Sequence, residues 1–304
     1  MDGPAQQPVP RGPADRIPPP ALFLTSGLTQ YLGAALAVGL FAAVPAASVA
    51  WWRIAVSAVV LMAWRRPWRQ AWTRSDLIAA ATFGVVLATM NVTFYIAIDH
   101  LPLGTAVAIE FLGPVAVAGI AGQGWRDRAG IALAALGVVL LAGVQLDQEF
   151  TAGTMVGLIA ILGSAISWAG YILLGRRMAV RRDGISSLAV GMTAGAVVWA
   201  PLAFGAFLPV VTDAALAAAV IGVAVLSSVI PYVLEQLVLR RVTAARFAIL
   251  LAMLPVTAAL IGAVGLAQIP NVLEIVGMAL ICAAIVLSGR RPGPAPSPDS
   301  PLPG

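Results

Sequence analysis

The sequence carries very little charge for its length, and this scarcity excludes most classes of soluble protein. Only 10% of its 304 residues are Asp, Glu, Lys or Arg, whereas 60% are hydrophobic. Soluble domains have about 25% charged residues and at most about half apolar ones. A soluble enzyme, a nucleic-acid-binding module and a disordered chain are therefore excluded. The composition indicates an α-helical protein that crosses a membrane many times.

Cysteine, histidine and lysine are scarce or absent. The single cysteine, Cys282, has no partner for an internal disulfide or a multi-cysteine metal site. The single histidine, His100, falls in an expected loop, so neither a metal cluster nor a Ser/His pair can be built around it. No metal, cofactor or catalytic residue is predicted. Because lysine is absent, all 18 basic residues are arginine, which carries little chemical meaning.

Proline is concentrated at the two ends of the chain. Residues 1–20 hold seven of the 22 prolines and residues 290–304 hold six. Such segments bury too little apolar surface to fold, so both are predicted to be disordered tails. The stretch between them, residues 21–289, is almost continuously apolar. Since a membrane-spanning helix needs about 20 residues, this stretch accommodates ten helices joined by short loops.

Clusters of Gly, Pro and Arg interrupt the apolar stretch and delimit the predicted spans. These are 21–41, 46–64, 77–98, 103–122, 129–146, 153–174, 187–207, 214–238, 243–265 and 271–288. Arginine supports this count, because membrane proteins retain Arg and Lys in their cytoplasmic loops. Every even-numbered span is followed by arginines, from Arg65 and Arg66 to Arg290 and Arg291, and no odd-numbered span is. Both termini are therefore predicted to be cytoplasmic. The net charge of +5 then reflects topology, and no nucleic-acid binding is expected.

Two halves of five spans, residues 21–146 and 153–289, show a weak internal repeat. Alignment of Pro114 with Pro255 matches Asn91–Ala118 to Tyr232–Ala259 without gaps, although few residues are identical. Because five is odd, the second half enters the membrane upside down. Inverted repeats are typical of secondary transporters, whose binding site lies near the middle of the membrane between the halves. The predicted fold is thus an all-α membrane protein, with ten transmembrane helices as two inverted five-helix repeats.

Glu110 is the sharpest candidate among the polar residues within the spans. An ionised side chain in the middle of a bilayer costs roughly 2.5–3.5 kcal/mol, so such a residue is a functional candidate by default. The neighbours of Glu110 on its helical face include Ala106, Gly113 and Pro114. Small residues allow another helix to approach closely. Glu110 is therefore predicted to face the bundle, to bind substrate and to couple transport to protons.

Further polar residues lie on small-residue faces of the first, third, sixth and eighth spans, and Arg53 lies well inside the second span. Arg53 either pairs with Glu110, which would give both a structural role, or binds a substrate carboxylate through two N–H groups. Glu235 lies nearer the cytoplasmic end, where an interfacial position is the alternative to a role in the site. The candidate substrate-binding residues are Gln30, Arg53, Asn91, Tyr95, Glu110, Trp168, Tyr171, Ser228, Tyr232 and Glu235.

Four stretches resemble the EamA-domain branch of the drug/metabolite transporter superfamily, and within it the inner-membrane threonine and homoserine exporters. They are Met90–Ile98, Leu101–Ala118, Ser167–Arg176 and Ser227–Glu235. The similarity extends over about residues 21–289. It implies ten helices in two inverted repeats around a central cavity, and efflux of small amino acids or related metabolites. The candidates that fall on the family's pattern are Arg53, Asn91, Tyr95, Glu110, Trp168, Tyr171, Tyr232 and Glu235.

Two positions depart from that pattern. Related sequences commonly have Met-Glu-Pro where this chain has Met253-Leu254-Pro255, and Gly-Glu where it has Ala267-Gln268. Two acidic positions are therefore neutral here, and any proton coupling that used them is not carried over. Glu110 remains as the predicted coupling residue.

These observations predict a secondary transporter of the bacterial cytoplasmic membrane. It would export a small threonine-like amino acid by proton antiport, with substrate and membrane lipid as its partners, as a monomer or homodimer. A broad-specificity drug or metabolite exporter, with a cavity lined by Met and aromatic residues, is the alternative within transport. A lipid scramblase or an intramembrane enzyme is the alternative of another class, and the missing catalytic dyad argues against the enzyme.

Overall fold

The computed structural model describes residues 17–121, 125–148, 151–179, 184–239 and 250–288, and every regular element in these ranges is helical. The first half of the chain contains α1 (Pro19–Leu40), α2 (Ala46–Arg65), η2 (Pro67–Arg69), α3 (Arg74–His100), α4 (Leu103–Glu110), α5 (Leu112–Ala121) and α6 (Trp125–Gln148). The second half contains α7 (Ala152–Ala179), α8 (Gly184–Val198), η3 (Ala200–Ala203), α9 (Phe207–Thr212), α10 (Ala214–Ala224), η4 (Val225–Val229), α11 (Ile230–Leu239), α13 (Met253–Leu266) and α14 (Val272–Ser288).

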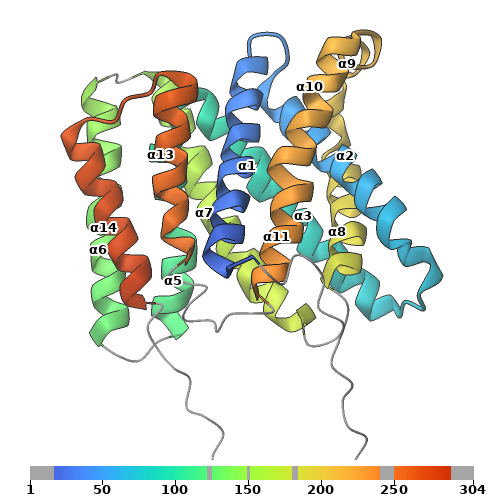
Figure 1. Ribbon diagram of the computed structural model, residues 1–304, viewed down its shortest axis with the longest axis horizontal. Helices are drawn as coiled ribbons and strands as arrows, with labels where there is room; N and C mark the ends of the chain where they lie inside the picture. The colour runs from blue at the N-terminus through green and yellow to red at the C-terminus, as the bar shows by residue number, and fades with distance from the viewer. Residues whose placement is uncertain (1–16, 122–124, 149–150, 180–183, 240–249, 289–304) are drawn as a thin grey trace, which may run out of the picture.

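The helices stand side by side as one bundle, and α1 begins and α14 ends at its lower side in Figure 1. Within the described ranges, six helices are long and apolar enough to cross a membrane, and four further apolar helices are shorter. The predicted all-α character and the long apolar helices are confirmed. Residues 243–249 of the predicted ninth span and most of both proline-rich tails lie outside the described ranges. Helix α1 begins at Pro19, within the predicted tail, because proline is favoured in the first helical turn.

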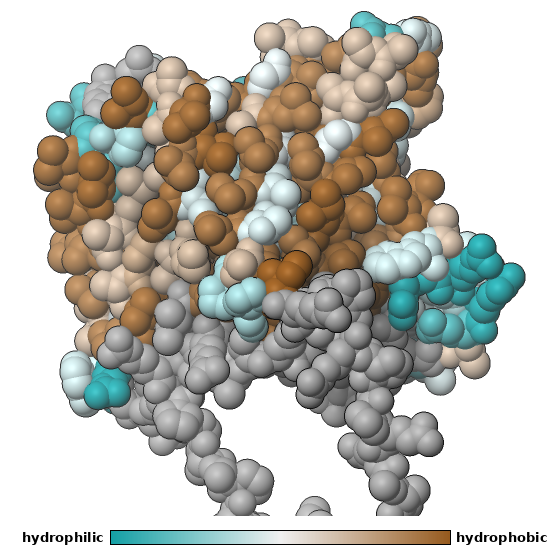
Figure 2. All heavy atoms as spheres, viewed as in Figure 1, coloured by the Kyte–Doolittle hydropathy of each residue, from teal (hydrophilic) through white to brown (hydrophobic). Residues whose placement is uncertain are grey.

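Apolar residues cover most of the bundle surface in Figure 2, where hydrophilic residues gather at the lower right, over the connection between α2 and α3. Large apolar side chains such as Ile166, Val264 and Val272 are 73%, 80% and 75% exposed. Water-soluble monomers rarely expose apolar patches of more than a few hundred Å². This surface therefore fits the hydrocarbon of a membrane.

The fourth predicted span is interrupted at Phe111, between α4 and α5. The sequence predicted a continuous helix over residues 103–122. Pro114 explains the difference, because it has no N–H to donate to the carbonyl of Glu110, four residues earlier. Glu110 consequently lies at the end of α4, directly before the break.

A turn of π-helix, η4, interrupts the eighth predicted span between α10 and α11. Pro231 follows it closely and lacks the N–H that would bond the carbonyl of Ser227. π-helical turns inside α-helices are frequent at functional sites. This turn leaves the Ser227 carbonyl available to a donor from another helix.

Helix α3 crosses α8 at a point where both helices carry glycine. A methyl group added at Gly84 would overlap with the backbone carbonyl of Gly191, and one added at Gly195 would lie 2.8 Å from the carbonyl oxygen of Gly84. The two backbones are therefore in direct contact, as small residues permit between membrane helices.

Candidate functional site

A cluster of polar side chains lies where the helices of the first half meet those of the second. Most of these side chains are buried, and Tyr232 and Glu235 are half-buried. The members come from α1, α2, α3, α4, α7, η4 and α11: Ser26, Arg53, Asn91, Tyr95, Glu110, Ser164, Ser227, Ser228, Tyr232 and Glu235. Helices distant in the chain thus bring together most of the predicted binding residues.

Arg53 is 5% exposed and is bound to the π-helical turn of the other half. Its Nε donates to the Ser228 hydroxyl at 2.7 Å, and its Nη2 donates to the Ser227 carbonyl oxygen at 2.7 Å. The second acceptor is the carbonyl to which Pro231, four residues later in the chain, has no N–H to donate. The guanidinium also lies 5.2 Å from the centre of the Tyr95 ring, a cation–π contact.

Glu110 accepts a hydrogen bond from the Ser164 hydroxyl at 2.5 Å. The same hydroxyl lies 3.0 Å from the carbonyl oxygen of Met90. Among the described residues no ion pair joins Glu110 to Arg53, although the two charges act on each other through space. Of the two roles that the sequence allowed for Arg53, direct pairing with Glu110 is therefore absent from this structure.

Glu235 lies beside Ser26 of α1. The Ser26 hydroxyl is 3.4 Å from a carboxylate oxygen of Glu235 and 3.4 Å from the carbonyl oxygen of Pro231. Glu235 also interacts electrostatically with Tyr171 and Tyr232. These contacts place the half-buried Glu235 in the polar cluster rather than in a purely interfacial position.

Two hydroxyl groups of the cluster are buried without a hydrogen-bond partner among the described residues. They belong to Tyr95, which is 0% exposed, and to Ser227. Buried hydroxyls are almost always hydrogen-bonded in proteins, and a functional site is one of the recognised explanations for an exception. The Tyr95 hydroxyl belongs to the same ring that lies against the Arg53 guanidinium.

The remaining predicted residues differ in how they relate to the polar cluster. The Asn91 amide donates to the Leu87 carbonyl at 2.8 Å and also interacts with the Tyr232 hydroxyl. Two aromatic candidates pack against phenylalanines, Trp168 on Phe111 and Tyr171 on Phe83, with ring centres 4.6 and 4.8 Å apart. Gln30 is half-buried on α1, and the described residues show no hydrogen bond between it and the cluster.

Tyr31 is a buried member of the cluster that the sequence reasoning missed. It interacts electrostatically with Glu110, Glu235 and Arg53, the charged residues of the site. Tyrosines in membrane proteins are commonly found in the interfacial belt, so the residue type gave no signal of its own. Its position directly after Gln30 was the only available hint.

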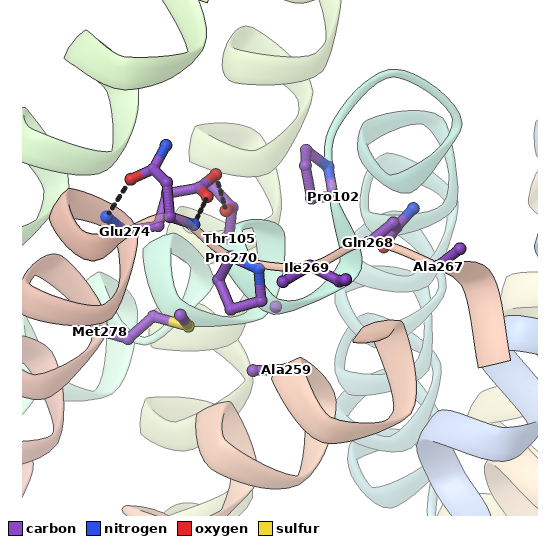
Figure 3. A pocket seen from close by; sticks show the side chains of 11 residues that line it. Pro102, Thr105, Ala259, Ala267, Gln268, Ile269, Pro270, Glu274 and Met278 are labelled. Carbon is purple, nitrogen blue, oxygen red and sulfur yellow. Dashed lines mark hydrogen bonds between the residues drawn. The ribbon is translucent and has the colours of Figure 1, made fainter. Parts of the chain in front are cut away.

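A second polar cluster, also missed, surrounds the buried carboxylate of Glu274 near the start of α14 (Figure 3). Glu274 accepts hydrogen bonds from Gln145 at 2.7 Å, Thr105 at 3.3 Å and the backbone N–H of Asn271 at 2.8 Å. Asn271 in turn accepts from the backbone N–H of Glu274 at 2.9 Å. This reciprocal pair is a capping box, whose Asn-x-x-Glu spacing was visible in the sequence.

This second cluster borders a cavity of about 270 Å³ between α4, α13 and α14. The side chain of Gln268 also accepts the backbone N–H of Leu103 at 2.9 Å, at the start of α4. The amide at position 268 thus makes a specific contact with the start of α4. All the contacts of this cluster join the ends of helices, which indicates a structural role.

Comparison with known proteins identifies the family to which a bundle with this polar centre belongs. The model of the EamA-like transporter family matches residues 155–290. The threonine/homoserine exporter RhtA of Salmonella typhimurium is 33% identical over 252 residues, which cover 83% of this chain and 84% of that protein. The chain belongs to the EamA family of the drug/metabolite transporter superfamily.

Other comparisons agree with this assignment. The threonine/homoserine exporter RhtA of Escherichia coli K12 is 32% identical over the same share of both chains. The uncharacterized transporter YvbV of Bacillus subtilis is 30% identical over 37% of this chain and 40% of its own. A solved crystal structure, with 19% identity and a TM-score of 0.56, covers 90% of this chain and 99% of its own and shares the fold. The protein is therefore a multi-pass inner-membrane transporter of an exporter family.

Proposed function

We propose that the protein exports small neutral amino acids, such as threonine or homoserine, across the cytoplasmic membrane in exchange for protons. One observation carries this proposal: Arg53 and Glu110 are buried in the same cluster without being paired to each other. A zwitterion presents the two complementary charges. The two exporters of Salmonella and Escherichia coli, by their names, act on amino acids of this class.

Arg53 is suited to hold the carboxylate of such a substrate. A guanidinium has five N–H donors, and the bonds to Ser228 and Ser227 use two of them. The Tyr95 hydroxyl, buried without a partner among the described residues, supplies a further donor beside the guanidinium. Bidentate bonds from Arg to a carboxylate provide both energy and orientation.

Glu110 is suited to hold the ammonium group and to carry the proton. A carboxylate that binds an ammonium cannot be protonated at the same time. Proton and substrate therefore compete for Glu110, and this competition is what antiport requires. The break at Phe111 places the carboxylate at the end of α4, beside the discontinuity that transporter sites typically use.

The arrangement of helices supports two inverted repeats of five spans. Three pairs of helices of equal rank in the two halves pack together, α2 with α8, α4 with α13, and α6 with α14, as helices close to a two-fold axis would. The first helix of each half also packs on the third span of the other half: α1 packs on η4 and α11, and α7 packs on α3. Ser26 of α1 approaches the Pro231 carbonyl, and Ser164 of α7 bonds the Met90 carbonyl. The alignment of Asn91 with Tyr232 makes Met90 and Pro231 equivalent.

The topology is tested with reporter fusions. We expect a reporter fused at Asp147 to be periplasmic and one fused at Arg181 to be cytoplasmic, because arginines follow the even-numbered spans. Helix α1 begins and α14 ends on the same side of the bundle, as an even number of spans requires. An alkaline phosphatase and green fluorescent protein pair at each site measures it. Opposite readings at both sites would overturn the proposed topology.

Export is tested first in cells. Overproduction in a bacterial host is expected to raise its tolerance to toxic threonine, homoserine or an analogue, and to lower the intracellular pool. Purified protein in proteoliposomes should then accumulate the same amino acid against its gradient when a pH gradient is imposed. Tolerance to hydrophobic cations alone would favour a broad-specificity drug exporter. Exchange of labelled lipid between leaflets without amino-acid movement would favour a scramblase.

A further inference from the structure

Two buried serines occupy corresponding positions on either side of the polar cluster. Ser26 and Ser164 are both 0% exposed, and each reaches into the opposite half of the chain. Each hydroxyl lies within reach of two acceptors, a glutamate carboxylate and a backbone carbonyl. For Ser164 these are Glu110 and Met90, and for Ser26 they are Glu235 and Pro231.

A serine hydroxyl has a single hydrogen to donate and two lone pairs to accept with. When Glu110 is ionised, it is an acceptor only and takes the hydrogen of Ser164. When Glu110 is protonated, its own O–H can donate to Ser164, and the serine hydrogen is then free to turn to the Met90 carbonyl. The protonation state of the carboxylate thus determines whether the Ser164 hydrogen is given to Glu110 or is available to the Met90 carbonyl.

The two serines differ in how tightly they are held. Ser164 is closer to Glu110 than to the Met90 carbonyl, at 2.5 Å against 3.0 Å. Ser26 is equally far from both of its acceptors, at 3.4 Å, beyond the usual O–H···O range of 2.5–3.0 Å. The Ser164 hydroxyl therefore makes its shorter hydrogen bond to the carboxylate, whereas the Ser26 hydroxyl is equally distant from its two acceptors.

We propose that Glu235 is a second proton-binding carboxylate of the transport site, and that Ser26 and Ser164 are positioning residues whose hydroxyls turn between carboxylate and carbonyl as Glu235 and Glu110 gain or lose a proton. The proposal rests on the proton coupling proposed above and extends it to a second carboxylate. It links each protonation event to a hydrogen bond across the interface between the halves, which is the interface that must rearrange in alternating access.

The charged and titratable neighbours of the two carboxylates differ. Glu110 interacts electrostatically with Arg53 on α2, Tyr31 on α1 and Tyr232 on α11. Glu235 interacts with Tyr31, Tyr171 and Tyr232, which are all uncharged phenols. Among the described side chains, the Ser26 hydroxyl is a donor within 3.4 Å of a carboxylate oxygen of Glu235. The Ser26 hydroxyl is thus expected to respond to protonation of Glu235.

Infrared difference spectroscopy of the purified full chain, titrated with acid, tests the proposal directly. A protonated buried carboxyl gives a C=O stretching band, and loss of a hydrogen bond moves that band to higher frequency. Glu110→Gln and Glu235→Gln should each remove one band. Ser164→Ala should raise the frequency of the Glu110 band alone, and Ser26→Ala that of the Glu235 band alone. Ser164→Thr, which keeps a hydroxyl, should return the Glu110 band toward its wild-type frequency.

Ser57→Ala is the matched control. Ser57 is also buried and also reaches across the interface, but its described acceptor is a backbone carbonyl, that of Ala224 at 3.4 Å, and not a carboxylate. It should leave both bands unchanged. If Ser26→Ala fails to fold, Glu235→Gln still decides whether Glu235 binds a proton. The proposal is overturned if Glu235→Gln removes no band at any pH, or if Ser26→Ala leaves the Glu235 band in place.

The spectra need no transported substrate, which separates this proposal from the proposed function. If the bands respond as expected although the protein moves no amino acid in proteoliposomes, the two hydroxyl–carboxylate pairs would stand, and the proposed substrate would be wrong. Amino-acid export driven by a pH gradient, with a spectrum that lacks a Glu235 band, would retain the transporter and reject the second carboxylate.

Discussion

Glu110→Gln is expected to abolish proton-driven amino-acid accumulation and to leave the protein folded. Glutamine has nearly the same volume, and its carbonyl oxygen can still accept the hydrogen bond from Ser164. The glutamine side chain cannot bind or release a proton at physiological pH, and it offers no charge to an ammonium group. Because Arg53 is held by Ser228 and Ser227 rather than by Glu110, the change does not remove a direct partner from a buried cation.

Two measurements on this variant separate coupling from structure. Accumulation in proteoliposomes under an imposed pH gradient reports coupling, and thermal unfolding in detergent reports stability. Asp147→Asn is the matched control, because the same chemical change is made at an exposed carboxylate of α6, and it should alter neither quantity. A stable Glu110→Gln protein with normal gradient-driven accumulation would contradict the role of Glu110. A loss of about 3–5 kcal/mol would mean that Glu110 balances a buried charge instead.

Much of the helical layout follows from the sequence because apolar length and polar breaks determine it locally. Helices α2, α6 and α14 coincide with predicted spans to within a few residues. The face of Glu110 was also predictable, since Gly113 and Pro114 mark where another helix approaches. Helix α7 does pack there, and a methyl group added at Gly113 would overlap with the carbonyl of Ala165.

The partners of the polar residues were not predictable, because backbone atoms freed by irregular helix supply several of them. One acceptor of Arg53 is the Ser227 carbonyl, to which Pro231, four residues later, has no N–H to donate. No residue type marks a π-helical turn in advance. Glu235 was placed near the membrane surface by its sequence position alone, whereas the packing of α1 on α11 brings Ser26 against it.

Gly84→Ala is expected to cause a large loss of stability, although it adds only one methyl group. The added methyl group would overlap with the carbonyl and Cα of Gly191, which are backbone atoms that cannot rotate away. Overpacking of a well-packed interior costs ~1–3 kcal/mol and occasionally more, and here α3 and α8 must separate to relieve it. Since these helices join the two halves beside the polar cluster, we expect both a lower unfolding temperature and a loss of export.

Gly143→Ala is the matched control. It makes the same glycine-to-alanine change in a helix, but at a position where the added methyl group has room. Gly143 lies in α6, and a methyl group there would meet nothing within 4 Å among the contacts that the structure describes. Alanine is favoured over glycine in a helix by about 1 kcal/mol, so this variant should be as stable as the wild type or slightly more so. Thermal unfolding of both variants in the same detergent provides the comparison. Equal unfolding temperatures would show that α3 and α8 are not in backbone contact at Gly84, because the two substitutions differ chiefly in what the new methyl group meets.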